Sequence, residues 1–269
     1  MLKLPRFRAA AVQASPVYLN PSATADKAAS LVREAASHGA KLVAFPEVFV
    51  PGYPYWNWIT DPVTGSAWFE KLAKASILVP GPEIDVVRKA ARDAGCYVVL
   101  GVNERSPVSL GAIYNTLVFI GPDGALLGKH RKLVPTWAEK LTWTGGDGSS
   151  LRVYDTEIGR LGALACGENT NTLARFALLG QGELVHVASY ISLPVAPPPT
   201  TTWRRRSNCA RLPILSKARS LRSSPVRRFR RRSLRQWRPS SPTRERACSA
   251  SRAHSPESSV RTGAWSEIP

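Results

Sequence analysis

The chain has 269 residues, a formal net charge of +18 and four cysteines. This length is sufficient for one sizeable α/β domain or two smaller ones. No apolar run approaches the roughly 18 residues needed to span a membrane, and neither a signal-peptide pattern nor a metal-type CxxC spacing is present. We therefore expect a soluble cytoplasmic protein with no membrane partner.

The positive charge is concentrated in residues 200–269, which contain 17 Arg and one Lys against three Glu. The same segment has 14 Ser and no sustained helix or strand periodicity. Such an excess of Arg over Lys is typical of GC-rich coding DNA read out of frame, so we predict a frameshift between Pro197 and Thr202. The alternative is a disordered basic tail that binds nucleic acid non-specifically.

Residues 1–199 have an ordinary globular composition and alternate between strand and helix patterns, which predicts one α/β domain followed by the tail at 200–269. A long loop is expected between 48 and 81, and hairpins at 113–132 and 151–166. The expected strands are 8–14, 41–47, 97–104, 113–120, 125–132, 151–159, 160–166 and 184–189; the expected helices begin near 20, 82 and 170.

Three chemically reactive residues close three of these strands. Glu47 ends "LVAFPE", Lys132 ends "LLGKHRK" and Cys166 ends "LGALAC". Taken singly, each has a structural interpretation: a packed cysteine, a solvated carboxylate and a solvated lysine. Cys96 and His130 keep such structural interpretations. Because α/β sheets hold ligands at strand carboxyl ends, the combination predicts a site with a base, a cation and a nucleophile.

Three segments, "AFPEVFVPGYP", "GKHRKLVPTWAEKLTWTGGDG" and "GALACGENTNTLARFALLGQGELVHVASY", resemble the signature segments of the nitrilase family of carbon-nitrogen hydrolases. The resemblance runs from about Phe7 to Tyr190. It implies an αββα sandwich. Nitrilases continue well beyond the point where this chain becomes Arg- and Ser-rich, so we expect an incomplete sandwich with little activity of its own.

The resemblance also implies a site. Glu47, Lys132 and Cys166 match the family's catalytic triad, and Glu139 matches a second glutamate that positions the lysine and the substrate. The implied reaction converts a small nitrile to a carboxylic acid and ammonia, with no cofactor and no metal. Intact members of the family form homo-oligomers.

The expected chemistry explains why a thiol is needed at Cys166. A nitrile carbon is a weak electrophile, and a thiol attacks it as thiolate. We expect Lys132 and the helix beginning near Thr170 to raise the thiolate fraction. The product of attack is a covalent thioimidate, and Glu47 would move protons and activate water for its hydrolysis.

The aromatic loop "VPGYPYWNWIT" follows Glu47 directly. We expect Tyr53 and Trp56 to help position the substrate by walling an apolar pocket, the alternative being a surface or subunit contact. The sequences "CGEN" and "KHRKLVPT" favour nitriles as substrates. Cyanide-converting and amidase-type activities remain alternatives, as do a non-enzymatic basic nucleic-acid-binding protein and an inactive, aggregation-prone fragment.

Overall fold

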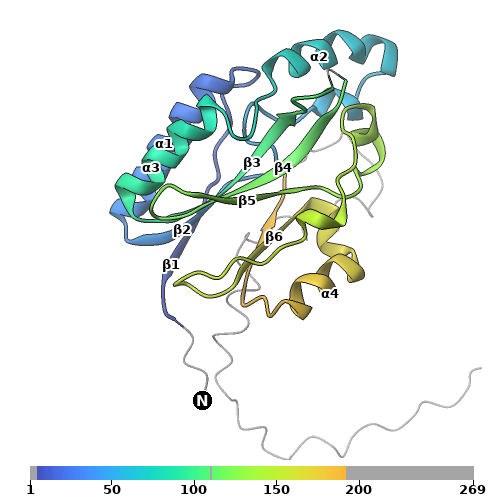
Figure 1. The fold of residues 1–269 in the computed structure, drawn as a ribbon. Coiled ribbons are helices and arrows are strands. Elements are labelled where there is room, and N and C mark those ends of the chain that lie inside the picture. The colour runs from blue at the N-terminus through green and yellow to red at the C-terminus, as the bar shows by residue number, and fades with distance from the viewer. Residues whose placement is uncertain (1–4, 110, 192–269) are drawn as a thin grey trace, which may run out of the picture. The chain divides into compact units, whose positions relative to one another are not determined.

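The computed structural model describes residues 5–109 and 111–191. They form a five-stranded sheet and a two-stranded sheet, with helices on the outer side of each (Figure 1). The predicted frameshift, the boundary at residue 199 and the tail at 200–269 lie outside the described residues. Within the described part, no helix is both long and apolar enough to cross a membrane.

The larger sheet has the strand order β1-β2-β3-β4-β5. Strands β1, β2 and β3 are parallel, whereas β4 and β5 continue the sheet as an antiparallel hairpin. The predicted hairpin at 113–132 is therefore confirmed. The strands are β1 (Arg8–Ala11), β2 (Ala40–Ala44), β3 (Tyr97–Arg105), β4 (Ile113–Ile120) and β5 (Leu126–Arg131).

Two helices, α1 (Pro21–Ser37) and α3 (Pro82–Ala94), lie side by side on one face of this sheet (Figure 1). Asn20 caps α1 by accepting the N–H of Ala23 at 3.0 Å, and Gly95 ends α3 with a left-handed φ of 59°. The buried core between the helices and the sheet includes Ala28, Val32, Val87, Val98 and Leu100.

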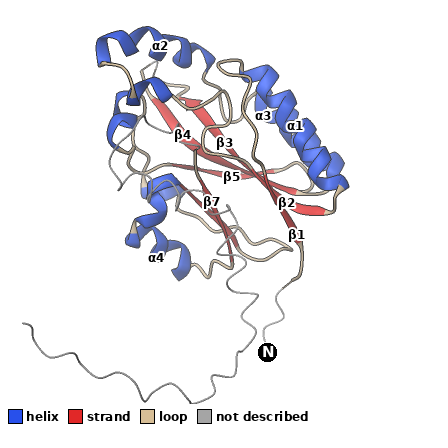
Figure 2. Ribbon diagram, turned by 180° about the vertical axis from the view of Figure 1, so that it is seen from behind, coloured by secondary structure: helices blue, strands red, loops and turns tan. Residues whose placement is uncertain are grey.

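The second sheet pairs β6 (Leu161–Ala165) in parallel with β7 (Val185–Ser189). Alternate residues of the larger sheet face it, and the joint core includes Leu42, Val99, Phe119, Leu161 and Val187. Helix α4 (Thr172–Gly180) covers the outer side of this pair (Figure 2). The four layers confirm the predicted αββα arrangement.

The predicted second hairpin, 151–166, is wrong. Residues 151–159 make only an isolated bridge, between Tyr154 and Leu161, and β6 pairs instead with β7. Every residue of β6 is buried, so its sequence does not show whether the neighbouring strand is the adjacent segment or a distant parallel one.

The expected long loop contains helix α2 (Pro62–Ala75) and a short 3₁₀ helix, η1 (Tyr55–Trp58). Asp61 caps α2 by accepting the N–H groups of Val63 and Thr64, both at 3.0 Å. Three further 3₁₀ helices are η2 (Trp137–Leu141), η3 (Gly148–Ser150) and η4 (Cys166–Thr170). Strands β1 and β2 are shorter than predicted: they end at Ala11 and Ala44, where the expected strands ran to 14 and 47.

Candidate active site

Cys166 lies at the abrupt turn between β6 and η4. The strand ends at Ala165, and Cys166 itself has a left-handed φ of 49°. Non-glycine residues rarely adopt this conformation, and where they do so the surrounding structure has to hold it. Cys166 is a partly exposed free thiol, whereas Cys96 is a free thiol fully buried in the core under α1 and α3.

Glu47 follows β2 and is 2% exposed. Its Oε1 accepts two hydrogen bonds, from Lys132 Nζ at 2.8 Å and from Asn115 Nδ2 at 2.6 Å. Its Oε2 is also buried but has no hydrogen-bond partner among the described residues. One oxygen of this carboxylate is therefore held in place, and the other is available to accept a proton.

Lys132 follows β5 and is 1% exposed. Its backbone N–H donates to the carbonyl of Asn115 at 2.8 Å, and its carbonyl accepts from Gly146 at 2.8 Å. The side chain reaches between two carboxylates, because Nζ lies 2.8 Å from Glu47 Oε1 and 2.7 Å from Glu139 Oε2. The lysine is thus fixed along its whole length.

Glu139 sits in η2 and, unlike Glu47, has both oxygens engaged. Oε2 accepts from Lys132 Nζ and from the N–H of Thr136, each at 2.7 Å, while Oε1 accepts from the hydroxyl of Tyr53 at 2.7 Å. A carboxylate with both oxygens engaged is suited to positioning the ammonium group rather than to exchanging protons.

The pKa shifts in this group follow from burial and from the two carboxylates. Burial raises the pKa of Glu47, with Lys132 opposing the shift. Burial works against the charge of Lys132, but Glu47 and Glu139 outweigh it and raise the pKa of its ammonium group. Lys132 is thus a permanent cation beside a carboxyl group that accepts protons more readily than an exposed one.

The same charges act on Cys166. Burial, then the charge of Glu47, raises the pKa of the thiol, and Lys132 counters only part of this. Helix α4 begins at Thr172, so η4 separates it from the cysteine. Lys132 acts on the thiol in the predicted direction, but burial beside two carboxylates outweighs it, and the predicted contribution of the helix end is not seen because η4 intervenes.

Sequence reasoning missed Asn115 and Tyr190, which both lie at this centre. Asn115 orients Glu47, and its own Oδ1 is buried without a partner among the described residues. Tyr190 follows β7 as Cys166 follows β6, and its pKa is raised by burial and then by the charges of Cys166 and Glu47. Asn115 lies within an expected strand and Tyr190 directly follows one, and only the pairing of strands shows that both residues reach this centre.

Glu168 joins the cysteine turn to the lysine segment. Its carboxylate is 2.9 Å from His130 Nε2, accepts the N–H of Leu133 at 2.9 Å, and accepts the N–H of Ala165 at 3.2 Å. His130 and Leu133 flank Lys132, so this buried glutamate sets the distance between the two segments. His130 is a structural hydrogen-bonding residue, as expected.

Residues of the aromatic loop make two kinds of contact: some reach the site, and others pack against neighbouring aromatic rings. Tyr53 reaches the site through its hydrogen bond to Glu139. The ring of Trp56 stacks on Trp68 with centroids 5.9 Å apart and meets Tyr18 edge-on at 6.5 Å. The pKa of Tyr55 is raised by burial and then by the charge of Glu47. The substrate-positioning roles of Tyr53 and Trp56 stay predictions.

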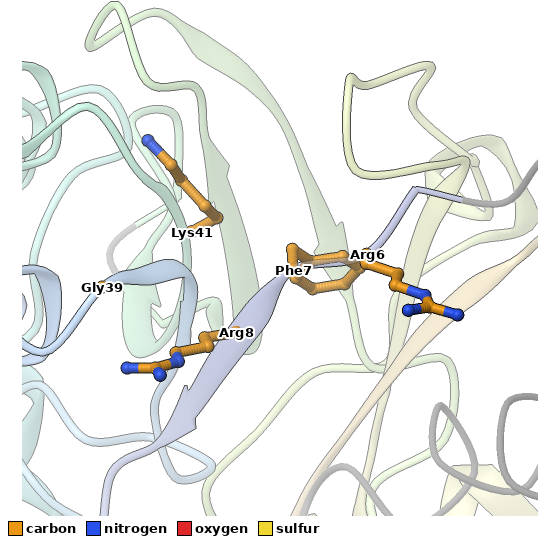
Figure 3. A pocket seen from close by; sticks show the side chains of 5 residues that line it. All are labelled: Arg6, Phe7, Arg8, Gly39 and Lys41. Carbon is orange, nitrogen blue, oxygen red and sulfur yellow. The ribbon is translucent and has the colours of Figure 1, made fainter.

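A hollow lined by Arg6, Phe7, Arg8, Gly39 and Lys41 is separate from this centre (Figure 3). It lies at the amino ends of β1 and β2, whereas Glu47 follows the carboxyl end of β2. Across residues 5–109 and 111–191, no cluster of three or more His, Cys, Asp or Glu side chains is arranged to hold a metal ion.

Residues 8–219 match the family described as carbon-nitrogen hydrolase. The chain belongs to this family. The chain is 43% identical over 185 residues to the aliphatic nitrilase of Rhodococcus rhodochrous, a match covering 68% of the chain and 50% of that protein. It is also 43% identical over 190 residues to a nitrilase of Bacillus sp. (strain OxB-1), covering 71% of the chain and 55% of that protein.

The chain thus spans about half the length of these curated relatives. Its fold also matches the crystal structure of a carbon-nitrogen hydrolase from Helicobacter pylori, with a TM-score of 0.56 and 18% identity. That match covers 75% of this chain and 66% of the other. At this identity the structural likeness shows the fold alone.

Proposed function

We propose that this chain carries the catalytic group of a nitrilase, with Cys166 as nucleophile, Glu47 as general base and Lys132 as the stabilising cation. The observation that carries the proposal is the asymmetry between the two glutamates. Glu139 has both oxygens occupied, whereas Glu47 keeps Oε2 free beside Lys132. Sequence identity of 43% to proteins named nitrilases supports a nitrile as substrate.

The first half of the reaction forms the covalent intermediate. Glu47 takes the thiol proton as Cys166 Sγ bonds to the nitrile carbon, and then passes that proton to the nitrile nitrogen, giving a thioimidate. A thiol with a raised pKa needs this base at the moment of attack. Lys132 stabilises the negative charge that develops on the nitrogen.

The second half consumes two water molecules. Glu47 removes a proton from the first water as the water oxygen adds to the thioimidate carbon, and passes this proton to the nitrogen. The proton of the added hydroxyl follows to the nitrogen as the carbon–nitrogen bond breaks, which releases ammonia and leaves a thioester. The second water adds in the same way, the carbon–sulfur bond breaks, and the proton returns to Sγ. The net change is nitrile plus two waters to carboxylic acid plus ammonia.

The test measures ammonia release from aryl, arylacetyl and aliphatic nitriles, together with the mass of the peptide that contains Cys166. We expect a nitrile-derived adduct on Cys166 in the parent chain and neither adduct nor ammonia with Cys166→Ala. Cys96→Ala is the matched control, since Cys96 lies in the core under the helices. Turnover by Cys166→Ala, or a parent chain that forms no nitrile-derived adduct on Cys166, would refute the proposal.

Two further expectations accompany this proposal. The family resemblance implies a homo-oligomer for intact members of the family, and the composition predicts a cytoplasmic location. Light scattering of the purified chain tests the first, and fractionation of the cells that produce it tests the second.

A further inference from the structure

Asn169 links the cysteine turn to a buried network that the reaction above does not use. Its Nδ2 donates to the carbonyls of Leu164 and Cys166, both at 3.0 Å. An amide nitrogen carries two protons, so these carbonyls take both of them. The Oδ1 atom of Asn169 then faces away from the turn, as an acceptor.

His186 of β7 meets that acceptor. Its Nε2 lies 2.7 Å from Asn169 Oδ1. Because an amide oxygen can only accept, Nε2 must carry the proton. On the other side of the ring, Nδ1 lies 2.6 Å from Glu183 Oε1. The ring thus lies between Glu183 at Nδ1 and Asn169 at Nε2, and its Nε2–H orients the amide.

The network is buried, and a glycine on the neighbouring strand leaves space for the Glu183 side chain. His186 is 6% exposed, and the Glu183 side chain is 2% exposed. Arg175 of α4 lies beside them, with Nη1 3.0 Å from Glu183 Oε2 and 2.5 Å from His186 Nδ1. Gly162 is the register partner of His186, and a Cβ there would lie 2.2 Å from Glu183 Oε1.

At the Asn169 end, the network contacts the backbone of Cys166, whose conformation sets the direction of the thiol. Cys166 has a left-handed φ of 49°, and its own carbonyl is one of the two held by Asn169. A non-glycine residue keeps such a conformation only where neighbouring groups hold it. Loss of the amide donor would free this peptide group to rotate.

We propose that Glu183, His186 and Asn169 are positioning residues that hold the Cys166 turn in the conformation that directs its thiol at Glu47 and Lys132. The proposal rests on the proposed function for its purpose, since it concerns the same nucleophile. None of the three contacts the reacting atoms. Their effect on chemistry passes through the backbone of Cys166.

The decisive comparison is Asn169→Asp against Asn171→Asp. Asn169 donates through its Nδ2 amide group, and an aspartate has no such donor. Asn171 caps α4 only by accepting through Oδ1, and an aspartate keeps this acceptor. We measure the rate at which iodoacetamide alkylates Cys166, followed by mass spectrometry, with thermal unfolding in parallel. We expect about tenfold slower alkylation with Asn169→Asp, since small misplacements of a reacting group are costly, and a parental rate with Asn171→Asp.

A second pair keeps the proposal testable if Asn169→Asp does not fold. His186→Gln retains an N–H donor close to the position of Nε2, whereas His186→Leu removes it. We expect Gln to restore most of the parental alkylation rate and Leu to lower it, and the same order for kcat with KM little changed. Equal alkylation rates across either pair, or a loss of thermal stability without a change in rate, would overturn the proposal.

These readouts separate the two proposals. Alkylation needs no nitrile, so a chain that fails to hydrolyse nitriles but shows the expected rate differences would keep the positioning proposal and refute the proposed activity. A chain that hydrolyses nitriles equally well with Asn169→Asp and Asn171→Asp would do the reverse.

Discussion

Lys132 and Glu47 form an ion pair of 2.8 Å in which both side chains are completely buried. Burying such a pair costs desolvation free energy, and removing either charge leaves the other buried without a partner, which destabilises the fold. Glu139 adds a second carboxylate at 2.7 Å from the same ammonium group, so the site carries one negative charge in excess. That excess, together with burial, explains why the pKa values of Glu47 and Cys166 are raised.

Replacing Lys132 should therefore damage both activity and stability. Lys132→Met keeps the length of the side chain but leaves two buried carboxylates without a cation. We expect a loss of about 3 to 5 kcal/mol of unfolding free energy, the usual cost of breaking a buried pair, and no measurable ammonia release. Chemical denaturation and an ammonia assay check this. Lys140→Met, at an exposed position of η2, is the control and should match the parent.

Glu47→Gln tests the base. The variant keeps the shape and one oxygen acceptor but cannot take up a proton, so we expect ammonia release to fall by at least about a hundredfold. The control is Glu70→Gln, because Glu70 lies on the surface with Lys74 as its partner at 2.5 Å. A Glu47→Gln variant within a few-fold of the parental rate would show that another group moves the proton.

Gly101 supports Glu47 from the neighbouring strand. A Cβ at Gly101 would lie 2.3 Å from the carbonyl oxygen of Pro46 and 2.5 Å from the N–H nitrogen of Val48. Gly101→Ala should therefore push the Glu47 segment away from β3 and cost about 1 to 3 kcal/mol of stability. Thermal unfolding measures this, with Gly148→Ala as control because no atom lies within 4 Å of its added Cβ. Equal melting temperatures would contradict the expectation.

Glu104 should make the fold sensitive to acid. Burial alone would raise its pKa, but hydrogen bonds from Arg131, Lys129 and Thr116 outweigh burial and lower it from the ordinary 4.5. A carboxyl group with a lowered pKa stabilises the fold above the unfolded-state value, and this stabilisation is lost as the pH falls through 4.5 and below.

We therefore expect the unfolding free energy of the parent to fall between about pH 6 and pH 3, and Glu104→Gln to lower stability at pH 7 while flattening this slope. Urea unfolding at a series of pH values measures both effects. Asp123→Asn, which changes a carboxylate in the exposed turn between β4 and β5, is the control. An unchanged slope in Glu104→Gln would assign the acid sensitivity to other groups.

Much of the fold could be predicted from local pattern. Capping residues and apolar periodicity placed α1, α3 and the β4–β5 hairpin, whereas helix α2 was missed although Asp61 and Pro62 form a typical helix start. The second hairpin was predicted wrongly because the uniformly apolar β6 carries no signal of its partner. Strand pairing depends on packing between segments far apart in the chain, which local periodicity does not report.

The sequence by itself was enough to propose the central residues of the site. The ends of three expected strands pointed to Glu47, Lys132 and Cys166, and the family resemblance added Glu139. Only the tertiary structure decided their states: which glutamate has a free oxygen, that the thiol has a raised pKa, and that Asn115, Glu168 and Asn169 hold the reacting groups. The physical reason is that protonation and orientation depend on burial and on charges within a few ångströms, and these neighbours come from distant parts of the chain.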